Sequence, residues 1–181
     1  MKIMIASDIH GSALYCRRLL ERFDEEGADK LLLLGDLLYH GPRNPLPEEY
    51  DPKVVAAMLN ARKQQILCVK GNCDGEVDQM MLEFPILADY CILSAGKRMI
   101  FATHGHHHNE NSLPMLQKGD ILLHGHTHIP VLEDRGDYIL ANPGSVTLPK
   151  QNSVRGYLLL EDSILTLKDL DNTVERKLSL R

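Results

Sequence analysis

Five short motifs in this sequence carry side chains that could bind metal ions. They are Asp8-Ile9-His10, Gly35-Asp36, Gly71-Asn72, His104-Gly105-His106 and Gly125-His126-Thr127-His128. Carboxylate, amide and imidazole groups together supply the oxygen and nitrogen ligands that borderline divalent metals such as manganese, iron and zinc prefer. The set offers enough ligands for two metal ions that share one carboxylate.

Each motif alone is a weak signal, because a lone Asp-x-His or His-x-His is more often coincidental than a ligand pair. Their placement is more informative, since every motif follows a short apolar run typical of a buried strand. Carboxylates dominate the early motifs and histidines the later ones, and all nine histidines lie at or before His128. Core packing does not explain this order, so we interpret the motifs as one site.

The elements that must position these motifs begin with a β-α-β-α-β alternation. Apolar runs at 2–8, 30–36 and 65–72 predict strands, and residues 13–28 and 52–63 have the spacing of helices. Gly27 marks the end of the first helix, and Pro52 suits the first turn of the second. The Pro- and Gly-rich segment 38–52 predicts a loop. This alternation favours a parallel sheet flanked by helices, with ligands outside the carboxyl ends of its strands.

The second half has the pattern of a meander of mostly antiparallel strands. Short apolar runs alternate with turns at Ala95-Gly96, Arg135-Gly136 and Glu161-Asp162. We expect the two halves to form two sheets that face each other within one domain spanning 1–181. The predicted strands cover 90–95, 97–104, 120–125, 129–134, 137–144, 155–162 and 164–170.

In combination the motifs resemble the calcineurin-like metallophosphoesterase family. The family pattern is D-x-H, G-D, G-N-H-[DE], a His, and G-H-x-H, and the resemblance runs from Met1 to about Pro149. The 35–47 stretch, Gly71-Asn72-Cys73-Asp74 and Asn142-Pro143-Gly144-Ser145 look most like small bacterial and archaeal phosphodiesterases of this family. The resemblance implies an α/β (α+β) fold, a four-layer αββα sandwich of two mixed sheets flanked by helices.

The resemblance also implies a ligand set for two divalent ions. Asp8, His10, Asp36 and His128 would hold the first ion, and Asp36, Asn72, His104 and His126 the second, with Asp36 bridging. We expect Mn²⁺, with Zn²⁺, Fe²⁺ or Ni²⁺ as alternatives. Two cations about 3.5–4 Å apart repel, and a shared carboxylate and hydroxide offset this repulsion. The expected reaction is hydrolysis of a small phosphodiester by the bridging hydroxide.

The sequence departs from the family pattern at Cys73, where the family usually has the histidine that assists the transition state or the leaving group. A thiol is a weaker hydrogen-bond donor than an imidazolium. Asp74, which would orient that histidine, loses its usual partner. The candidate catalytic residues are Asn72, Cys73, Asp74, His104 and His106.

Several polar residues near the motifs allow two interpretations. Cys73 could act as a nucleophile, but no base adjoins it in the sequence and activated water already supplies one. His107 and His108 fit a solvated loop better than substrate contacts, and His124 fits a strand end near the site. His40, Arg43 and Asn44 lie in the loop at 38–52, which could shape substrate access or be plain surface. Asn142 and Ser145 fit a structured turn, which could also support the metal ligands.

Composition limits the classes of protein to be considered. A chain of 181 residues with 44% hydrophobic and 25% charged residues suits one globular domain. The net charge of −5 disfavours a stable nucleic-acid complex, and no apolar run approaches the ~20 residues that span a bilayer. Four cysteines without metal-binding spacing predict reduced thiols and a cytoplasmic protein.

Two other functions stay open beside phosphodiester hydrolysis. A phosphomonoesterase would use the same chemistry on another substrate. A protein-interaction scaffold of the same fold would have a degraded metal site, whereas here all seven ligand positions carry competent side chains. The expected partner is a small phosphate ester, and homo-oligomer formation is left open.

Overall fold

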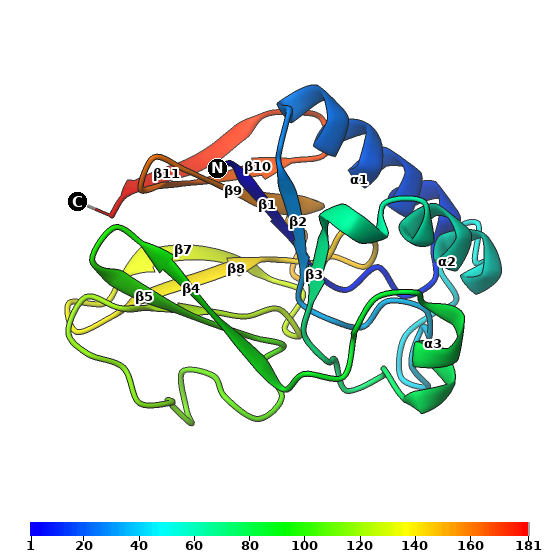
Figure 1. Ribbon diagram of the computed structural model, residues 1–181, viewed down its shortest axis with the longest axis horizontal. Helices are drawn as coiled ribbons and strands as arrows, with labels where there is room; N and C mark the ends of the chain where they lie inside the picture. The colour runs from blue at the N-terminus through cyan, green and yellow to red at the C-terminus, as the bar shows by residue number, and fades with distance from the viewer. Residues whose placement is uncertain (181) are drawn as a thin grey trace.

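The first half of the chain forms the parallel sheet and helices predicted from the sequence. A computed structural model describes residues 1–180 (Figure 1). Strands β1, β2 and β3 pair in parallel in that order. The elements are β1 (Ile3–Ala6), α1 (Ala13–Glu26), β2 (Lys30–Leu33), α2 (Pro52–Asn60), the 3₁₀ helix η1 (Lys63–Gln65), β3 (Ile66–Cys68) and α3 (Glu76–Met81).

Local sequence explains where the two longer helices begin and end. Ser12 caps α1 by accepting a hydrogen bond from the Tyr15 backbone N–H at 3.3 Å. Gly27 ends α1 in the left-handed conformation, with φ of 60°. Pro52 occupies the first turn of α2, where its missing N–H costs no intrahelical hydrogen bond. The short helix α3 was not predicted, because six residues are too few to show a helical period.

The second sheet is mixed, so the prediction of a mostly antiparallel meander was wrong for its centre. Strand order is β4-β5-β6-β8-β7, in which β5, β6 and β8 run parallel and only the outer pairs are antiparallel. A long loop joins β5 to β6, and the chain passes through β7 before it returns as β8, so both connections allow parallel pairing. The strands are β4 (Tyr90–Ala95), β5 (Arg98–Thr103), β6 (Ile121–Leu123), β7 (Pro130–Asp134) and β8 (Ile139–Pro143).

The last three strands return to the first sheet, which corrects the expected division into one sheet per half. Strand β9 (Gly156–Glu161) pairs antiparallel with β1, and β10 (Ile164–Asp169) and β11 (Val174–Ser179) extend the same edge. The pattern did not predict β11, because its residues are mostly exposed and polar. The first sheet therefore has the order β11-β10-β9-β1-β2-β3.

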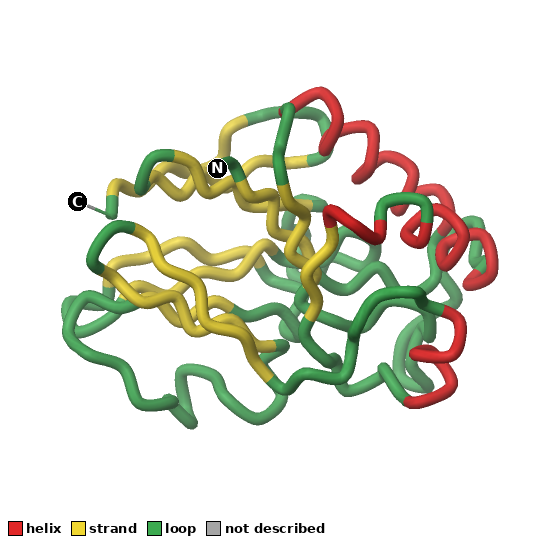
Figure 2. The backbone as a smooth tube through the Cα atoms, viewed as in Figure 1, coloured by secondary structure: helices red, strands yellow, loops and turns green. Residues whose placement is uncertain are grey.

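The two sheets pack face to face, and their strands show the alternation that this packing requires. In β1, Ile3 and Ile5 face the second sheet, while Met4 and Ala6 face the helices. Helices α1 and α2 cover the outer face of the first sheet (Figures 1 and 2). This confirms the sandwich of two mixed sheets.

One layer differs from the expected αββα arrangement. Within residues 1–180, no helix covers the outer face of the second sheet. The apolar side chains of Phe101, Leu122 and Leu140 on that face are buried instead with the help of Leu116, which lies in the loop that follows β5. Also within 1–180, no helix has the length and apolar character needed to cross a bilayer.

Truncation of Leu32 should test the packing between the two sheets. Leu32 is fully buried there, so Leu32→Ala should lower the free energy of unfolding by about 2–5 kcal/mol through lost contacts and a cavity. Leu67, on the edge strand β3, is 41% exposed, and Leu67→Ala makes the same chemical change at a cost of about 1 kcal/mol or less. Urea unfolding measures both values, and equal losses would contradict the described packing.

Candidate metal centre

The candidate ligands come together because the strands that precede them end at the same edge of the two sheets. Asp8 and His10 follow β1, Asp36 follows β2, and Asn72 follows β3, three strands that run parallel. His104 follows β5, and His126 and His128 follow the parallel neighbour β6. Chain direction in both sheets therefore delivers all seven side chains to one region.

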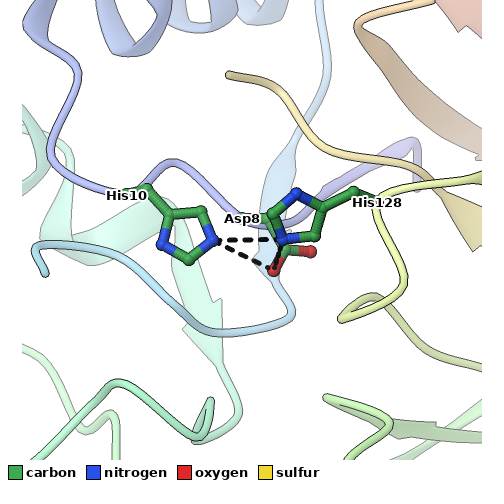
Figure 3. Close-up of side chains that lie close together, drawn as sticks. All are labelled: Asp8, His10 and His128. Atoms are coloured by element: carbon green, nitrogen blue, oxygen red, sulfur yellow. Dashed lines mark hydrogen bonds and ion pairs between the residues drawn. The ribbon is translucent and has the colours of Figure 1, made fainter. Parts of the chain in front are cut away.

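Three of these side chains form a first cluster (Figure 3). The Asp8 Oδ1 atom lies 3.3 Å from His128 Nε2 and 3.6 Å from His10 Nε2. The two imidazole Nε2 atoms are 3.2 Å apart. Tetrahedral ligands at bond lengths of about 2.1 Å would be separated by about 3.4 Å, so the cluster has the spacing of a metal site. All three side chains are almost fully buried.

A second cluster contains His104, Asn72 and His126. The Nε2 atom of His104 lies 3.1 Å from Asn72 Oδ1 and 3.2 Å from His126 Nδ1. These separations resemble those of the first cluster. His104 is buried, whereas Asn72 is exposed and His126 is partly exposed, so this cluster opens toward solvent.

Asp36 lies between the two clusters. Its Oδ2 atom is 3.7 Å from His10 Nε2 of the first cluster and 3.5 Å from His104 Nε2 of the second. Its Oδ1 atom accepts a hydrogen bond of 2.8 Å from the Cys73 backbone N–H, which fixes the orientation of the carboxylate. One oxygen therefore faces both clusters, as a bridging ligand would require.

Backbone carbonyls determine which imidazole nitrogen faces each cluster. The Nδ1 atoms of three histidines lie next to carbonyl oxygens: His10 to Tyr39 at 2.9 Å, His104 to Leu34 at 2.6 Å and His128 to Leu148 at 2.7 Å. A carbonyl can only accept, so each Nδ1 must carry the proton, and in the neutral ring the Nε2 lone pair faces the cluster.

The donor set fits a cation better than it fits hydrogen bonding. When both rings are neutral, the imidazoles of His10 and His128 direct lone pairs at each other, and Asp8 Oδ1 is buried without a hydrogen-bond partner among residues 1–180. Buried acceptors without donors are destabilising unless a cation or proton lies among them. A divalent metal in each cluster would satisfy these acceptors.

The pKa values of two groups also indicate that the site has an excess of negative charge. Burial disfavours a charged His104, but the carboxylates of Asp36 and Asp8 outweigh it and raise the pKa of His104 to about 9. Burial likewise opposes ionisation of Asp8, yet the adjoining His10 and His128 lower the pKa of Asp8 well below its usual value. Without a metal, a proton on His104 therefore supplies part of the missing positive charge.

Strained backbone at the strand ends orients the candidate ligands. Positive φ angles occur at five of the seven candidate ligands, all of them non-glycine residues for which this region is uncommon. Such strain persists only where the surrounding structure holds it and is concentrated at functional sites. The five are Asp8 (60°), His10 (50°), Asp36 (55°), His126 (65°) and His128 (63°).

Two glycines allow these strained loops to approach one another. A Cβ atom added to Gly71 would lie 2.1 Å from Asp36 Oδ1, and one added to Gly125 would lie 1.9 Å from Ser7 Oγ. Both distances are far below van der Waals contact. Gly71 and Gly125 therefore have a steric role in bringing Asp36 and the His126 loop into place.

The turn after β8 holds the loops that carry the candidate ligands. Asn142 Nδ2 donates to the Gly125 carbonyl at 2.9 Å, and Ser145 Oγ donates to the Asp8 carbonyl at 2.8 Å. Thr147 Oγ1 donates to the Ile9 carbonyl at 2.7 Å. Of the two interpretations for Asn142 and Ser145, the geometry favours support of the candidate ligands. Thr147 was missed, although its position directly after the Asn142–Ser145 turn was a usable signal.

Asp74 has partners that the sequence did not reveal. Its buried carboxylate accepts backbone hydrogen bonds from Gly71 at 2.7 Å, Asp36 at 2.8 Å and Leu37 at 2.9 Å. It therefore ties the loop after β2 to the loop after β3, through partners other than the histidine that the family usually has at position 73. The Cys73 side chain lies beside it, partly exposed, with its Sγ atom 3.2 Å from Asn72 Nδ2.

The other histidines take different places. The His106 ring lies 5.4 Å from that of His104 and 6.3 Å from that of His126, between centroids. His107 is exposed, and His108 packs edge-on against Phe101. His124 is buried, with Nε2 3.2 Å from Glu110 and Nδ1 3.0 Å from the Gly125 carbonyl.

The loop at 38–52 borders the candidate metal centre. A cleft of about 410 Å³ is lined by Arg43 and Asn44 from this loop, together with Asp36, Cys73 and His126. His40 does not line the cleft, because its ring packs between those of Tyr39 and Tyr50. Of the two interpretations for Arg43 and Asn44, the geometry favours shaping of access to the site.

Comparison with known proteins connects this arrangement with phosphate-ester hydrolysis. Residues 1–163 match the family model described as the calcineurin-like phosphoesterase superfamily domain. The chain is 47% identical to phosphodiesterase YfcE of Escherichia coli strain K12 over 95% of this chain and 94% of that protein. It is 29% identical to the probable metallophosphoesterase YsnB of Bacillus subtilis over 94% and 91% of the two chains.

A solved structure agrees with these sequence matches. The chain superposes on the phosphoesterase YfcE from E. coli with a TM-score of 0.97 and 44% identity, over the full length of both chains. The similarity therefore includes both sheets and the loops that carry the candidate ligands.

Metal affinity should rise with pH because a metal must displace the proton from His104. The pKa of His104 in the metal-free protein is raised to about 9, so the ring is charged at neutral pH and becomes a ligand only after losing that proton. The affinity for Mn²⁺ should increase by up to about tenfold per pH unit between pH 6.5 and 8.5. Calorimetry in buffers of different ionisation enthalpy measures both the affinity and the released proton.

The exposed His107 provides the control for this pH dependence. His107→Gln should keep the wild-type slope, because the side chain lies outside both clusters. An affinity that stays constant over this pH range would contradict the assigned proton on His104.

Proposed function

Because the chain belongs to the calcineurin-like phosphoesterase superfamily, we propose that it hydrolyses small phosphodiesters with two divalent metal ions. The observation that carries the proposal is the position of Asp36 Oδ2, which faces an imidazole of each cluster at 3.5 and 3.7 Å. The proposed ligands are Asp8, His10, Asp36 and His128 for one ion, and Asp36, Asn72, His104 and His126 for the other.

When bound, the two ions supply Lewis acidity and an activated water molecule for attack on phosphorus. The protein contributes the orientation of the ligands. Asp36 is held by the Cys73 backbone N–H, and the imidazoles of His10, His104 and His128 are held by backbone carbonyls. Such supporting contacts fix the tautomers and typically affect metal affinity or activity by 10- to 100-fold.

Charges around the cleft support an anionic substrate. Arg43 and Lys150 line the cleft beside His126 and His128, and both carry exposed side chains. Their positive charge would attract a phosphate ester to a chain whose net charge is −5. Asn72, which is exposed at the edge of the second cluster, is positioned to contact the phosphoryl group as well.

The proposed site lacks an efficient proton donor for the leaving group. Burial and the charge of Asp36 raise the pKa of the Cys73 thiol, so it is neither a nucleophile nor a ready acid at neutral pH. Burial and the neighbouring His104 lower the pKa of His106 to about 4, so its ring is neutral at pH 7. The leaving oxygen would therefore depart with little protonation, which favours esters whose leaving groups are stable anions.

Other features of the proposal have narrower support. Mn²⁺ is the preferred ion because the ligands mix carboxylate, amide and imidazole groups, with Zn²⁺, Fe²⁺ and Ni²⁺ as alternatives. A single domain is supported by the core shared between the two sheets. Four unpaired cysteines support a cytoplasmic location. The scaffold alternative has less support, because none of the seven ligand positions is degraded.

Replacing Asp36 should impair both proposed metal sites together. Asp36→Asn replaces a charged bridging oxygen by a neutral amide, so kcat/KM for bis(p-nitrophenyl) phosphate should fall by about 100-fold or more at fixed Mn²⁺. Metal analysis of the equilibrated variant should show weaker retention of both ions. Asp134→Asn, at the exposed end of β7, is the matched control and should behave as wild type.

Metal dependence is tested in the same assay. Chelation and dialysis should abolish hydrolysis, and added Mn²⁺ should restore it. Full activity in excess chelator, or a near-wild-type rate for Asp36→Asn, would refute the proposed bridging role.

Rates for Cys73 variants should reveal the missing proton donor. For wild type, rates should fall steeply as the pKa of the leaving alcohol rises, because an acid in the site is typically worth about 10²–10⁴-fold for poor leaving groups. Cys73→His should flatten this dependence by offering an imidazole, and Cys73→Ser should have a mild effect. The measurement is a series of aryl and alkyl phosphodiesters with each protein.

Loss of turnover in Cys73→Ser would have a different meaning. If the variant retained both metals but no activity, the thiol would have a direct chemical role. The interpretation that the Cys73 thiol is neither a nucleophile nor a proton donor would then be wrong.

A further inference from the structure

Two cavities of different character meet at Cys73. One is the polar cleft of about 410 Å³ that contains the candidate metal ligands and Arg43. The other, here called the side cavity, has about 390 Å³ and is lined by apolar side chains that include Tyr39, Tyr50, Val77 and Met81. Cys73 lines both cavities, so a ligand in one lies next to the other.

The side cavity keeps apolar surface in contact with water. Val77 is 74% exposed, Met81 43% and Tyr39 42%. Charged groups contribute only Lys53 and Asp78 to its lining. Apolar surface of this kind gains about 25 cal/mol for each Å² that a ligand covers. The cavity is therefore suited to an uncharged alkyl or aryl group.

The walls of the side cavity are built on the loops that carry the candidate ligands. The Tyr39 carbonyl accepts the hydrogen bond from His10 Nδ1 at 2.9 Å. The Tyr50 ring packs so closely on Gly11, the residue after His10, that an added Cβ would lie 2.5 Å from its Cε2 atom. The distance from the side cavity to the first cluster is therefore fixed by direct contacts.

We propose that the side cavity binds the alkyl or aryl substituent of a phosphodiester whose phosphoryl group lies at the candidate metal centre. This inference rests on the proposed function and deepens it by naming a substrate class. A diester carries two substituents, and the two cavities that adjoin at Cys73 differ in the substituent they accept. The polar cleft with Arg43 and Lys150 suits a polar or anionic substituent, and the side cavity suits an apolar one.

A substrate series with one constant leaving group tests this proposal. In p-nitrophenyl alkyl phosphates the alkyl group varies from methyl to butyl while the departing p-nitrophenolate stays the same. For the Mn²⁺-loaded wild type, kcat/KM should rise about two- to fourfold per added methylene, the upper value corresponding to complete burial. Calorimetric Kd values for O-alkyl methylphosphonates, which have no p-nitrophenolate to lose, should show the same trend.

Variants of α3 test whether the dependence on alkyl length arises in the side cavity. Val77→Ser and Met81→Ser replace exposed side chains that line the side cavity, so neither should prevent folding. Both should lower the ratio of kcat/KM for the butyl ester to kcat/KM for the methyl ester, which measures the dependence on alkyl length. Met80, 85% exposed on the same helix, does not line the cavity, and Met80→Ser should retain the full dependence.

The possible results separate this inference from the proposed function. If every ester were hydrolysed at the same rate, the proposed phosphodiesterase activity would stand and the proposed role of the side cavity would be wrong. If Kd depended on alkyl length but no ester were hydrolysed, the proposed role of the side cavity would stand and the proposed activity would be wrong. If Val77→Ser kept the full length dependence but changed the sedimentation mass, this surface would be a contact between copies, and the proposal would be wrong.

Discussion

Buried hydrogen-bond acceptors without donors are the constraint on which this structure depends. At the candidate metal centre, Asp8 Oδ1 has no hydrogen-bond partner among residues 1–180, and the Nε2 atoms of His10 and His128, which carry lone pairs in the neutral rings, face each other at 3.2 Å. Such a cluster is destabilising in itself, because desolvated acceptors lose water and gain nothing in return. Its retention in a fold with an ordinary apolar core implies a positive charge at this point. The pKa of His104 is raised for the same reason, because the nearby carboxylates favour a positive charge on its ring.

Much of the surrounding architecture can be understood as support for this unfavourable cluster. The two sheets bring parallel strand ends together, and the strands themselves are stabilised by apolar packing on both faces. Backbone carbonyls from Leu34, Tyr39 and Leu148 hold three imidazoles in one tautomer. Positive φ angles at five of the candidate ligands are tolerated because these contacts leave the loops little freedom. Strain and desolvation are thus concentrated at the site, and the core offsets them.

The Cys73-Asp74 pair changes the chemistry that such a centre can perform. Asp74 does not orient a catalytic side chain, because its two oxygens are occupied by the backbone amides of Asp36, Leu37 and Gly71. It acts as a positioning residue that holds the proposed bridging ligand Asp36. Cys73 contributes its backbone N–H to Asp36, while its small side chain separates the polar cleft from the side cavity. Under the proposed function, one position would therefore affect both the protonation of the leaving group and the shape of the substrate site.

The sequence alone determined the strand-helix alternation of the first half, the two-sheet sandwich and the identity of the candidate ligands. These features are local or periodic: apolar runs, a glycine at a helix end, and motifs directly after strands. Only the tertiary structure decided that β9–β11 join the first sheet, that β5, β6 and β8 run parallel, and that a loop replaces the outer helical layer. It also decided the partners of Asp74 and Thr147. Strand pairing and hydrogen bonds between distant loops depend on which surfaces meet in space, and side-chain periodicity along the chain carries no record of that choice.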